Sequence, residues 1–140
     1  MVISVGVCFK EYYVSTHKEF ETVRITELAE EAVRECGISE GMCIIHLPHA
    51  TAALILNEYE PHIASDYITL IKKLIPKGAG WRHDEIDTNA HAHLASAIIG
   101  STKVLPVRNG RLVRGTWQEL ILIELDGPRR RRVVIEVIGR

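Results

Sequence analysis

The sequence lacks most of the features that mark a secreted, membrane-bound or disulfide-stabilised protein. It has only three cysteines, an odd number without C-x-x-C spacing, so we expect buried thiols and neither a disulfide framework nor a thiolate zinc site. No apolar run approaches the roughly 20 residues needed to cross a bilayer. Residues 1–10 also lack the basic-then-apolar pattern of a signal peptide. We therefore expect a cytoplasmic protein without membrane contact.

Net charge is nearly absent as well. A formal net charge of -1 gives no general attraction to nucleic acid, and the short basic run 129–132 is interpreted as a solvated turn. No G-x-G-x-x-G or Walker-type loop is present, so nucleotide binding by those devices has no support. Glutamine occurs once and asparagine three times while arginine is abundant, a composition typical of thermophilic proteins.

The length and apolar content predict one α+β domain over residues 1–140. Helical spacing of apolar residues predicts three helices, at 26–36, 61–75 and 90–99. Alternating or continuous apolar runs predict strands at 2–10, 20–25, 42–47, 51–56, 104–107, 111–113, 117–125 and 131–138. Hairpin turns are expected at Asn109-Gly110 and at Asp126-Gly127-Pro128. These turns favour mainly antiparallel sheets in a sandwich-like core over a parallel, doubly wound sheet.

Residues at the predicted ends of the helices indicate where two of them begin and where one stops. Thr26 and Asn89 are expected to cap the first and third helices, and Gly37 to stop the first. Ile3, Val5, Val7 and Phe9 alternate with smaller or polar residues, which predicts a half-buried first strand.

Seven histidines are many for 140 residues, and five of them lie near predicted element ends: His46, His49, His83, His91 and His93. Converging imidazoles can hold a zinc-like ion, which needs about three protein ligands. His91 and His93 are about 200° apart on a helix, so both can bind one ion only if this segment is not yet helical; we favour His93, with His91 as the substitute ligand. The alternative is that the imidazoles cap helices or bond to the backbone, and spacing without an H-E-x-x-H pattern does not decide. His46 is expected in the core or on a sheet face, and His17 and His62 on the surface.

Two further polar segments are candidates for chemistry. Glu58 follows Asn57 at a strand end, where it can act as a general base or orient a histidine; the alternative is a helix-entry charge before Pro61. Asp66 is expected to be a solvated helix residue. Residues 115–118, Gly-Thr-Trp-Gln, form a flexible polar corner suited to a ligand, although Trp117 can equally be core.

The segments that carry these residues, taken in order, resemble the YjbQ family, also called UPF0047, over nearly the whole chain. They are His49-Ala50-Thr51-Ala52-Ala53, Asn57-Glu58, Asp66, His83, residues 89–94, Gly100-Ser101, residues 115–118 and residues 124–131. Ala50 and Leu56 depart from the family's usual hydroxyl residue and isoleucine. The resemblance implies an α+β fold with a sandwich-like core and a homotrimer with sites near subunit boundaries.

The resemblance also implies secondary thiamine-phosphate synthase activity, in which hydroxymethylpyrimidine diphosphate is coupled to a thiazole phosphate with loss of pyrophosphate. A divalent ion and arginines such as Arg111, Arg129 or Arg131 would neutralise the departing pyrophosphate. Because the site is rich in imidazole, zinc or a similar transition ion fits better than magnesium. The alternatives are a noncatalytic trimer that binds a metal or metabolite, and a metal-dependent hydrolase.

These arguments predict a specific site. We expect His49, His83 and His93 to be the metal ligands and Glu58 and His91 to be catalytic. Contacts to a small phosphorylated metabolite are expected from a further set: Thr51, Asn57, Asn89, Thr116, Gln118 and Arg131.

Overall fold

A computed structural model describes residues 4–140 as two antiparallel sheets and three α-helices, which confirms the predicted α+β class. The five-stranded sheet has the order β1 (Gly6–Ser15), β8 (Arg130–Gly139), β3 (Gly41–His46), β5 (Thr102–Arg108) and β6 (Arg111–Leu112). The three-stranded sheet has the order β2 (Glu21–Arg24), β7 (Glu119–Glu124) and β4 (Ala52–Asn57). The helices are α1 (Thr26–Cys36), α2 (Pro61–Leu74) and α3 (Ala90–Ile99), with a short 3-10 helix η1 (Arg82–Glu85) before α3.

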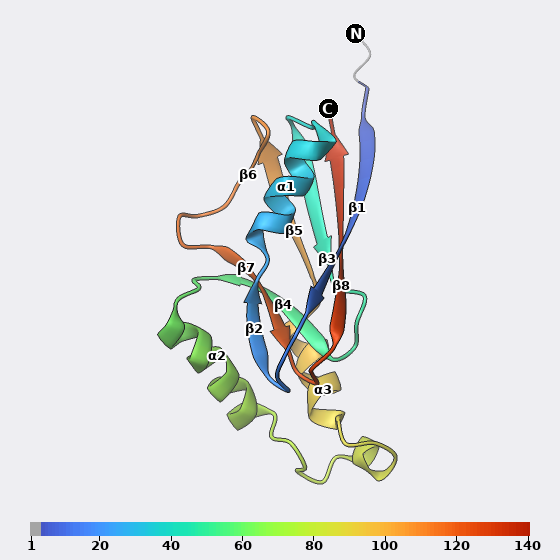
Figure 1. Cartoon of the computed structure of the whole chain (residues 1–140), viewed down its shortest axis with the longest axis vertical. Coiled ribbons are helices and arrows are strands. Elements are labelled where there is room, and N and C mark those ends of the chain that lie inside the picture. The colour runs from blue at the N-terminus through green and yellow to red at the C-terminus, as the bar shows by residue number, and fades with distance from the viewer. Residues whose placement is uncertain (1–3) are drawn as a thin grey trace.

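The elements form layers around two apolar clusters. The larger cluster lies between the inner face of the five-stranded sheet, helix α1 and one face of the three-stranded sheet. The smaller cluster lies between the other face of the three-stranded sheet and helices α2 and α3 (Figure 1). Strand β7 is therefore covered on both sides, which explains why its residues 120–123 form a continuous apolar run instead of an alternating one.

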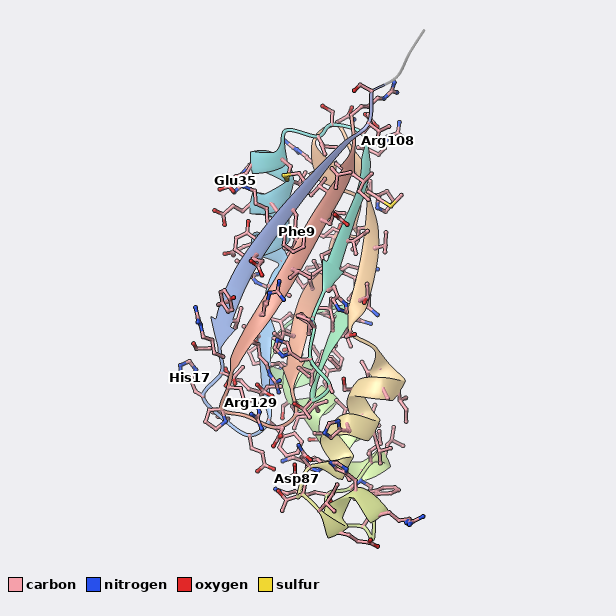
Figure 2. All side chains as sticks on the ribbon, turned by 90° about the vertical axis from the view of Figure 1, so that its right-hand side faces the viewer. Phe9, His17, Glu35, Asp87, Arg108 and Arg129 are labelled. Carbon is pink, nitrogen blue, oxygen red and sulfur yellow. A yellow bond between two sulfur atoms is a disulfide. The ribbon has the colours of Figure 1, made fainter. Side chains whose placement is uncertain are left out.

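The outer face of the five-stranded sheet is open in the single chain. Figure 2 looks onto this face, where Phe9 lies, with α1 behind the sheet. Val7, Ile138, Met42 and Pro106 are in register across β1, β8, β3 and β5, so one apolar row crosses four strands. Val7 is 66% exposed and Phe9 is 53% exposed. We call this surface the open sheet face.

The first strand corrects a prediction. The expected strand 2–10 overlaps β1, which begins at Gly6 and continues to Ser15; residues 2 and 3 lie outside the described part of the chain. Its alternation is real, but Val5, Val7 and Phe9 lie on the open sheet face, and the inward residues are Cys8, Tyr12 and Val14. A period of two shows that one face is apolar, and does not tell whether the chain itself covers that face.

The predicted second hairpin is also wrong. Strands β7 and β8 are consecutive, but β7 pairs with β2 and β4 while β8 pairs with β1 and β3. The turn at 126–128 carries the chain from one sheet to the other. The first hairpin is confirmed, because β5 and β6 pair around Asn109 and Gly110, which have φ values of 53° and 74°.

The three predicted helices are found, but two of their caps are wrong. The Thr26 hydroxyl donates to Glu119 Oε2 over 2.5 Å and accepts the Leu120 backbone N–H, so it joins α1 to β7 instead of capping α1. The Asn89 side chain makes no cap bond, and Asp84 Oδ1 accepts the Ala90 N–H in its place. Gly37 ends α1 in the left-handed conformation with φ 66°, as predicted.

The cysteines overturn the prediction of buried thiols. Cys8 of β1 and Cys36 at the end of α1 form a disulfide, with a Cα–Cα distance of 5.8 Å. Sequence spacing did not reveal the pair because the two residues meet only when α1 folds back across the sheet. Cys43 is free and buried, and burial raises the pKa of its thiol to about 12.

Removal of this disulfide is predicted to destabilise the fold. Its ends are 28 residues apart, so the loss of the crosslink from the unfolded chain costs about 3.5 kcal/mol in the chain-entropy account. Denaturant unfolding of Cys8→Ser should show this loss, and reductant should reproduce it in the unaltered protein. Reductant should leave Cys8→Ser itself unchanged; an unaltered protein that is equally stable with and without reductant would refute the prediction.

Candidate functional site

A buried ion pair holds together the end of the molecule where the chain passes between the sheets. The Nε atom of Arg131 donates to Glu124 Oε1 over 2.8 Å, and its Nη2 atom contacts Glu124 Oε2. Arg131 is 3% exposed and Glu124 is fully buried. The pair links β7 of one sheet to β8 of the other. We call this pair and its immediate partners the crossover hub.

Two threonines complete the crossover hub. Thr16, which follows β1, donates its hydroxyl to Glu124 Oε1 over 2.8 Å and accepts the Arg129 N–H. Thr51, which precedes β4, accepts from Arg131 Nη2 through both its carbonyl and its hydroxyl. The connections β1 to β2, β3 to β4 and β7 to β8 therefore all meet at one buried pair.

Hydrogen bonds set the charge state of the hub. Burial alone would raise the pKa of Glu124, but bonds from Arg131, the Asp126 N–H and Thr16 outweigh it and hold the pKa below its ordinary value of 4.5. Glu124 is thus a carboxylate at neutral pH, and its charge balances that of Arg131.

A pocket of about 620 Å³ opens above the crossover hub, and we call it the histidine pocket. Helix α3 contributes His93 from its first turn and Asn89 just before it, while the segment between β3 and β4 contributes His49 and Thr51. The segment from Pro128 to Arg131 forms the remaining wall. Five of the predicted site residues therefore line one pocket: His49, Thr51, Asn89, His93 and Arg131.

His49 is held as a neutral imidazole. The Arg132 backbone N–H donates to its Nε2 atom over 2.8 Å, so Nε2 is unprotonated and the ring carries its proton on Nδ1. Burial and the nearby charge of Arg131 lower the pKa of His49, in agreement with that state. Its remaining polar atom is a donor, which suits a bond to an oxygen of a ligand.

His83 joins the pocket through a chain of hydrogen bonds. Asn89 donates its Nδ2 to Asp126 over 2.9 Å, which leaves Asn89 Oδ1 to accept from His83 Nε2 at 3.2 Å. Asp126 also pairs with Arg129 at 3.0 Å. Burial by itself raises the pKa of Asp126, but bonds from Asn89 and Arg129 lower it below the ordinary value. Asn89 is therefore an orienting residue, and this use explains why it does not cap α3.

The histidines come together as a pair and not as a triad. The rings of His83 and His93 are 4.9 Å apart in an edge-to-face arrangement. Among residues 4–140, no three His, Cys, Asp or Glu side chains are grouped so that they could hold a metal ion. His49 Nε2 is already engaged by the backbone. One chain thus offers two imidazoles at the mouth of the pocket, and binding of one ion by His49, His83 and His93 stays a prediction.

His91 is directed away from His93, as the helical spacing indicates. It is 3% exposed, its ring lies 5.7 Å from that of Phe20, and neither ring nitrogen has a hydrogen-bond partner within the described chain. Burial lowers the pKa of His91. The predicted catalytic role of His91 gains no support from this position.

His17 and His62 are exposed and His46 lies on the open sheet face, as expected.

The other predicted site residues form a second group elsewhere. Thr51 lies just before β4, whereas Asn57 ends it, and six residue steps along a strand span about 20 Å. Asn57 is in register with Glu119, so residues 116–118 lie at the same far end of the sheet as Asn57 and Glu58. We call Asn57, Glu58, Thr116 and Gln118 the far-end group. Trp117, expected as a possible core residue, is 72% exposed beside it.

Three important polar residues were not singled out from the sequence: Thr16, Glu124 and Asp126. A signal for Glu124 exists, because it is a carboxylate within the apolar run 120–125, and a buried charge requires a partner. That signal does not identify Arg131 among four consecutive arginines. No helix of the described residues is long and apolar enough to cross a membrane.

The fold and site define a small two-sheet α+β protein with a pocket of histidines and arginines at the crossover between its sheets. The chain belongs to the YjbQ family, because residues 10–140 match the family described as UPF0047 protein YjbQ-like. A UPF0047 protein of Archaeoglobus fulgidus is 38% identical over 128 residues, which cover 91% of this chain and 99% of the relative. The Bacillus subtilis protein YugU is 34% identical over 93% of this chain and 98% of its own length.

Solved structures agree with this assignment. A YbjQ-like protein of unknown function from Sulfolobus solfataricus has a TM-score of 0.96 and 45% identity, with 98% of this chain and 100% of that chain covered. A hypothetical protein from Aeropyrum pernix has a TM-score of 0.92 and 38% identity, covering 94% of this chain and 98% of that one.

The crossover hub gives a prediction for stability and its pH dependence. Glu124→Gln leaves Arg131 buried without a counter-charge and should cost about 3 to 5 kcal/mol in denaturant unfolding at pH 7. Because the pKa of Glu124 is lowered on folding, its contribution is present above the ordinary value of 4.5 and is lost as pH falls through the folded pKa. The difference between the unaltered protein and Glu124→Gln should therefore shrink in acid.

Glu40→Gln is the matched control for this test. Glu40 pairs with Arg108 at an exposed site, where water screens both charges, so its loss should cost much less than the loss of Glu124. Equal costs for the two substitutions, or a Glu124→Gln cost that does not change between pH 7 and pH 3, would contradict the assigned role of the hub.

Proposed function

We propose that the protein is a transferase of the secondary thiamine-phosphate synthase type, which couples hydroxymethylpyrimidine diphosphate to a thiazole phosphate. The observation that carries the proposal is the histidine pocket, where the imidazoles of His49 and His93 lie beside the exposed guanidinium groups of Arg129 and Arg130. Such a set suits a ligand with phosphate oxygens, because both groups donate hydrogen bonds to them. The assignment of the two substrates rests on the family resemblance.

The reaction requires little from the protein beyond positioning and charge. The thiazole nitrogen supplies the electron pair of the new C–N bond at the pyrimidine methylene carbon. The C–O bond to the diphosphate breaks, and pyrophosphate leaves with the electron pair of that C–O bond. Negative charge therefore builds on the leaving group, and donors fixed beside it lower the barrier.

We assign these tasks to particular side chains of the pocket. Arg129 is half exposed and is oriented by Asp126, so its guanidinium can bind the diphosphate at the rim. Arg130 lies over the ring of Tyr13 at 3.9 Å, which also leaves it at the rim. Arg131 was expected to contact substrate, but its side chain is committed to Glu124 and Thr51. Its proposed part is to fix the wall from which Arg129 and His49 reach the substrate.

Metal binding is kept as a proposal with an altered ligand set. His83 and His93 are close enough to share an ion, but a site of about three protein ligands needs a further donor from outside the chain or from the diphosphate. An ion there would neutralise the leaving pyrophosphate. No step of the reaction as written above depends on it.

We further propose that the protein works as a homotrimer, the assembly implied by the family resemblance. The open sheet face is the surface best suited to an interface, since soluble monomers rarely expose a contiguous apolar patch of this kind. Several large apolar side chains on it are roughly half exposed or more: Val5, Val7, Phe9, Tyr13, Met42 and Val104.

The trimer would also explain the division of the predicted site. The far-end group lies too distant from the histidine pocket of the same chain to act with it. In a closed ring, each subunit meets two neighbours through two different surfaces, so opposite ends of adjacent copies can meet. We propose that the far-end group of one copy, with exposed Trp117, completes the histidine pocket of the next. Glu58 would then act on the substrate from the neighbouring subunit.

Turnover tests the proposed function. Purified protein given both precursors should form thiamine phosphate and release equimolar pyrophosphate, measured by chromatography. His93→Ala should lower kcat by about 100-fold, in the range found when a transition-state donor is removed. His62→Ala, which alters an exposed histidine outside the pocket, should leave kcat unchanged. Pyrophosphate release without coupling would point to the hydrolase alternative, and precursor binding without any turnover to the noncatalytic one; either would overturn the proposal.

Light scattering tests the assembly. The unaltered protein at micromolar concentration should have three times the mass of one chain, and Phe9→Glu should dissociate it by placing a charge on the open sheet face. Lys73→Glu is the control, since Lys73 is exposed on helix α2, which packs on the face of the three-stranded sheet that is turned away from the five-stranded sheet. A monomeric unaltered protein would refute the trimer, and a trimeric Phe9→Glu variant would refute the assigned face.

A further inference from the structure

Arg111, one of the arginines expected to face pyrophosphate, does not line the histidine pocket. It lies at a second cavity of about 630 Å³ between helix α1 and the segment that contains β6 and residues 113–116. The two cavities have no lining residue in common. In Figure 1, α1 and β6 lie toward one end of the molecule, and α3, which bears the histidine pocket, lies toward the other. We call the second cavity the arginine pocket.

Three guanidinium groups surround the arginine pocket, and only one of them has an acidic partner. Arg114 pairs with Glu30 at 3.0 Å and with Glu119 at 3.4 Å, so its orientation is fixed and its charge is balanced. Arg34 and Arg111 occur in none of the ion pairs among residues 4–140. The one carboxylate of the lining, Glu30, is paired with Arg114, so an anion in this cavity would find the exposed guanidinium groups of Arg34 and Arg111 available for charge-assisted hydrogen bonds.

The other lining residues indicate which groups the ligand would carry besides its negative charge. Val33 is 2% exposed and Leu112 is half-buried, so the pocket has an apolar wall beneath the arginines. Thr116 adds a hydroxyl group that can donate to or accept from a ligand. An apolar wall with a few charged groups that fix orientation is typical of a small-molecule site.

We infer that the arginine pocket binds a small organic phosphate, with the phosphate held between Arg34 and Arg111 and an apolar ring or chain against Val33 and Leu112. The planar guanidinium fork binds phosphate oxygens in pairs. A phosphate monoester carries about -1.5 to -2 charges at neutral pH, which matches the two free guanidinium groups. The inference does not depend on the proposed transferase activity, since it uses a different cavity and its two phosphate-binding residues, Arg34 and Arg111, have no part in the proposed transferase site.

Phenyl phosphate is a suitable probe, because it combines a phosphate with a flat apolar body. Its titration should shift the NMR signals of the Gly110 and Gly115 amides, which belong to the lining of this pocket and not to that of the histidine pocket. The doubly substituted variant Arg34→Gln with Arg111→Gln should bind it at least tenfold more weakly, and its NMR spectrum should show the fold intact because Arg34 and Arg111 are exposed. Arg108→Gln is the control: Arg108 belongs to the same hairpin and pairs with Glu40 outside the pocket, so binding should not change.

Three results would overturn the inference. The first is that the Gly110 and Gly115 signals stay in place at millimolar phenyl phosphate, and the second is that the doubly substituted variant binds as tightly as the unaltered protein. Benzoate binding as tightly as phenyl phosphate would show general attraction of anions instead of phosphate recognition. Phenol, which has the ring without the phosphate, should give no shift.

Discussion

The fold and the site both depend on the buried pair of Glu124 and Arg131. Two sheets that share no strand must be connected by segments that cross between them, and each crossing brings polar backbone into the interior. The pair satisfies three such crossings at once, through Thr16, Thr51 and its own two strands. Burying two charges costs free energy that offsets much of their mutual attraction, so the pair adds little net stability by attraction alone. Its main contribution is that it holds the three connecting segments in one arrangement. The wall of the histidine pocket is one product of that arrangement.

The same layering decides which surfaces remain for function. Strand β7 is covered on both sides, so the polar site residues of the three-stranded sheet lie at its two ends. One end carries the histidine pocket and the other the far-end group. The five-stranded sheet has helix α1 on one face, while none of residues 4–140 covers the other face, where the apolar row through Val7 and Met42 is exposed. A single chain thus has a divided set of polar groups and an apolar face, and the proposed assembly of copies would account for both.

Local features of the fold could be predicted from the sequence, and features that depend on distant contacts could not. The helix limits, the turn at Asn109-Gly110 and the stop at Gly37 were predicted because adjacent residues determine them. Thr26 and Asn89 have good capping side chains, but each is used for a bond to a distant strand or loop. The Cys8–Cys36 pair and the separation of β7 from β8 likewise appear only when the layers form. The pattern of histidines identified the pocket, yet it did not reveal that Glu58 and Gln118 lie at the opposite end of a sheet.

The claim that two copies complete one site can be tested with mixed assemblies. His93→Ala disables the histidine pocket and Gln118→Ala disables the far-end group, so each variant alone should be inactive with the two thiamine precursors. Co-expressed at equal levels, they should regain about a quarter of the unaltered activity, because about one site in four combines an intact pocket with an intact neighbouring group in a mixed ring. Co-expression of His93→Ala with His83→Ala should regain none, since both changes affect the same pocket. Mixed assemblies of His93→Ala and Gln118→Ala that stay inactive, although both variants are shown to be present in the same trimers, would contradict the shared site.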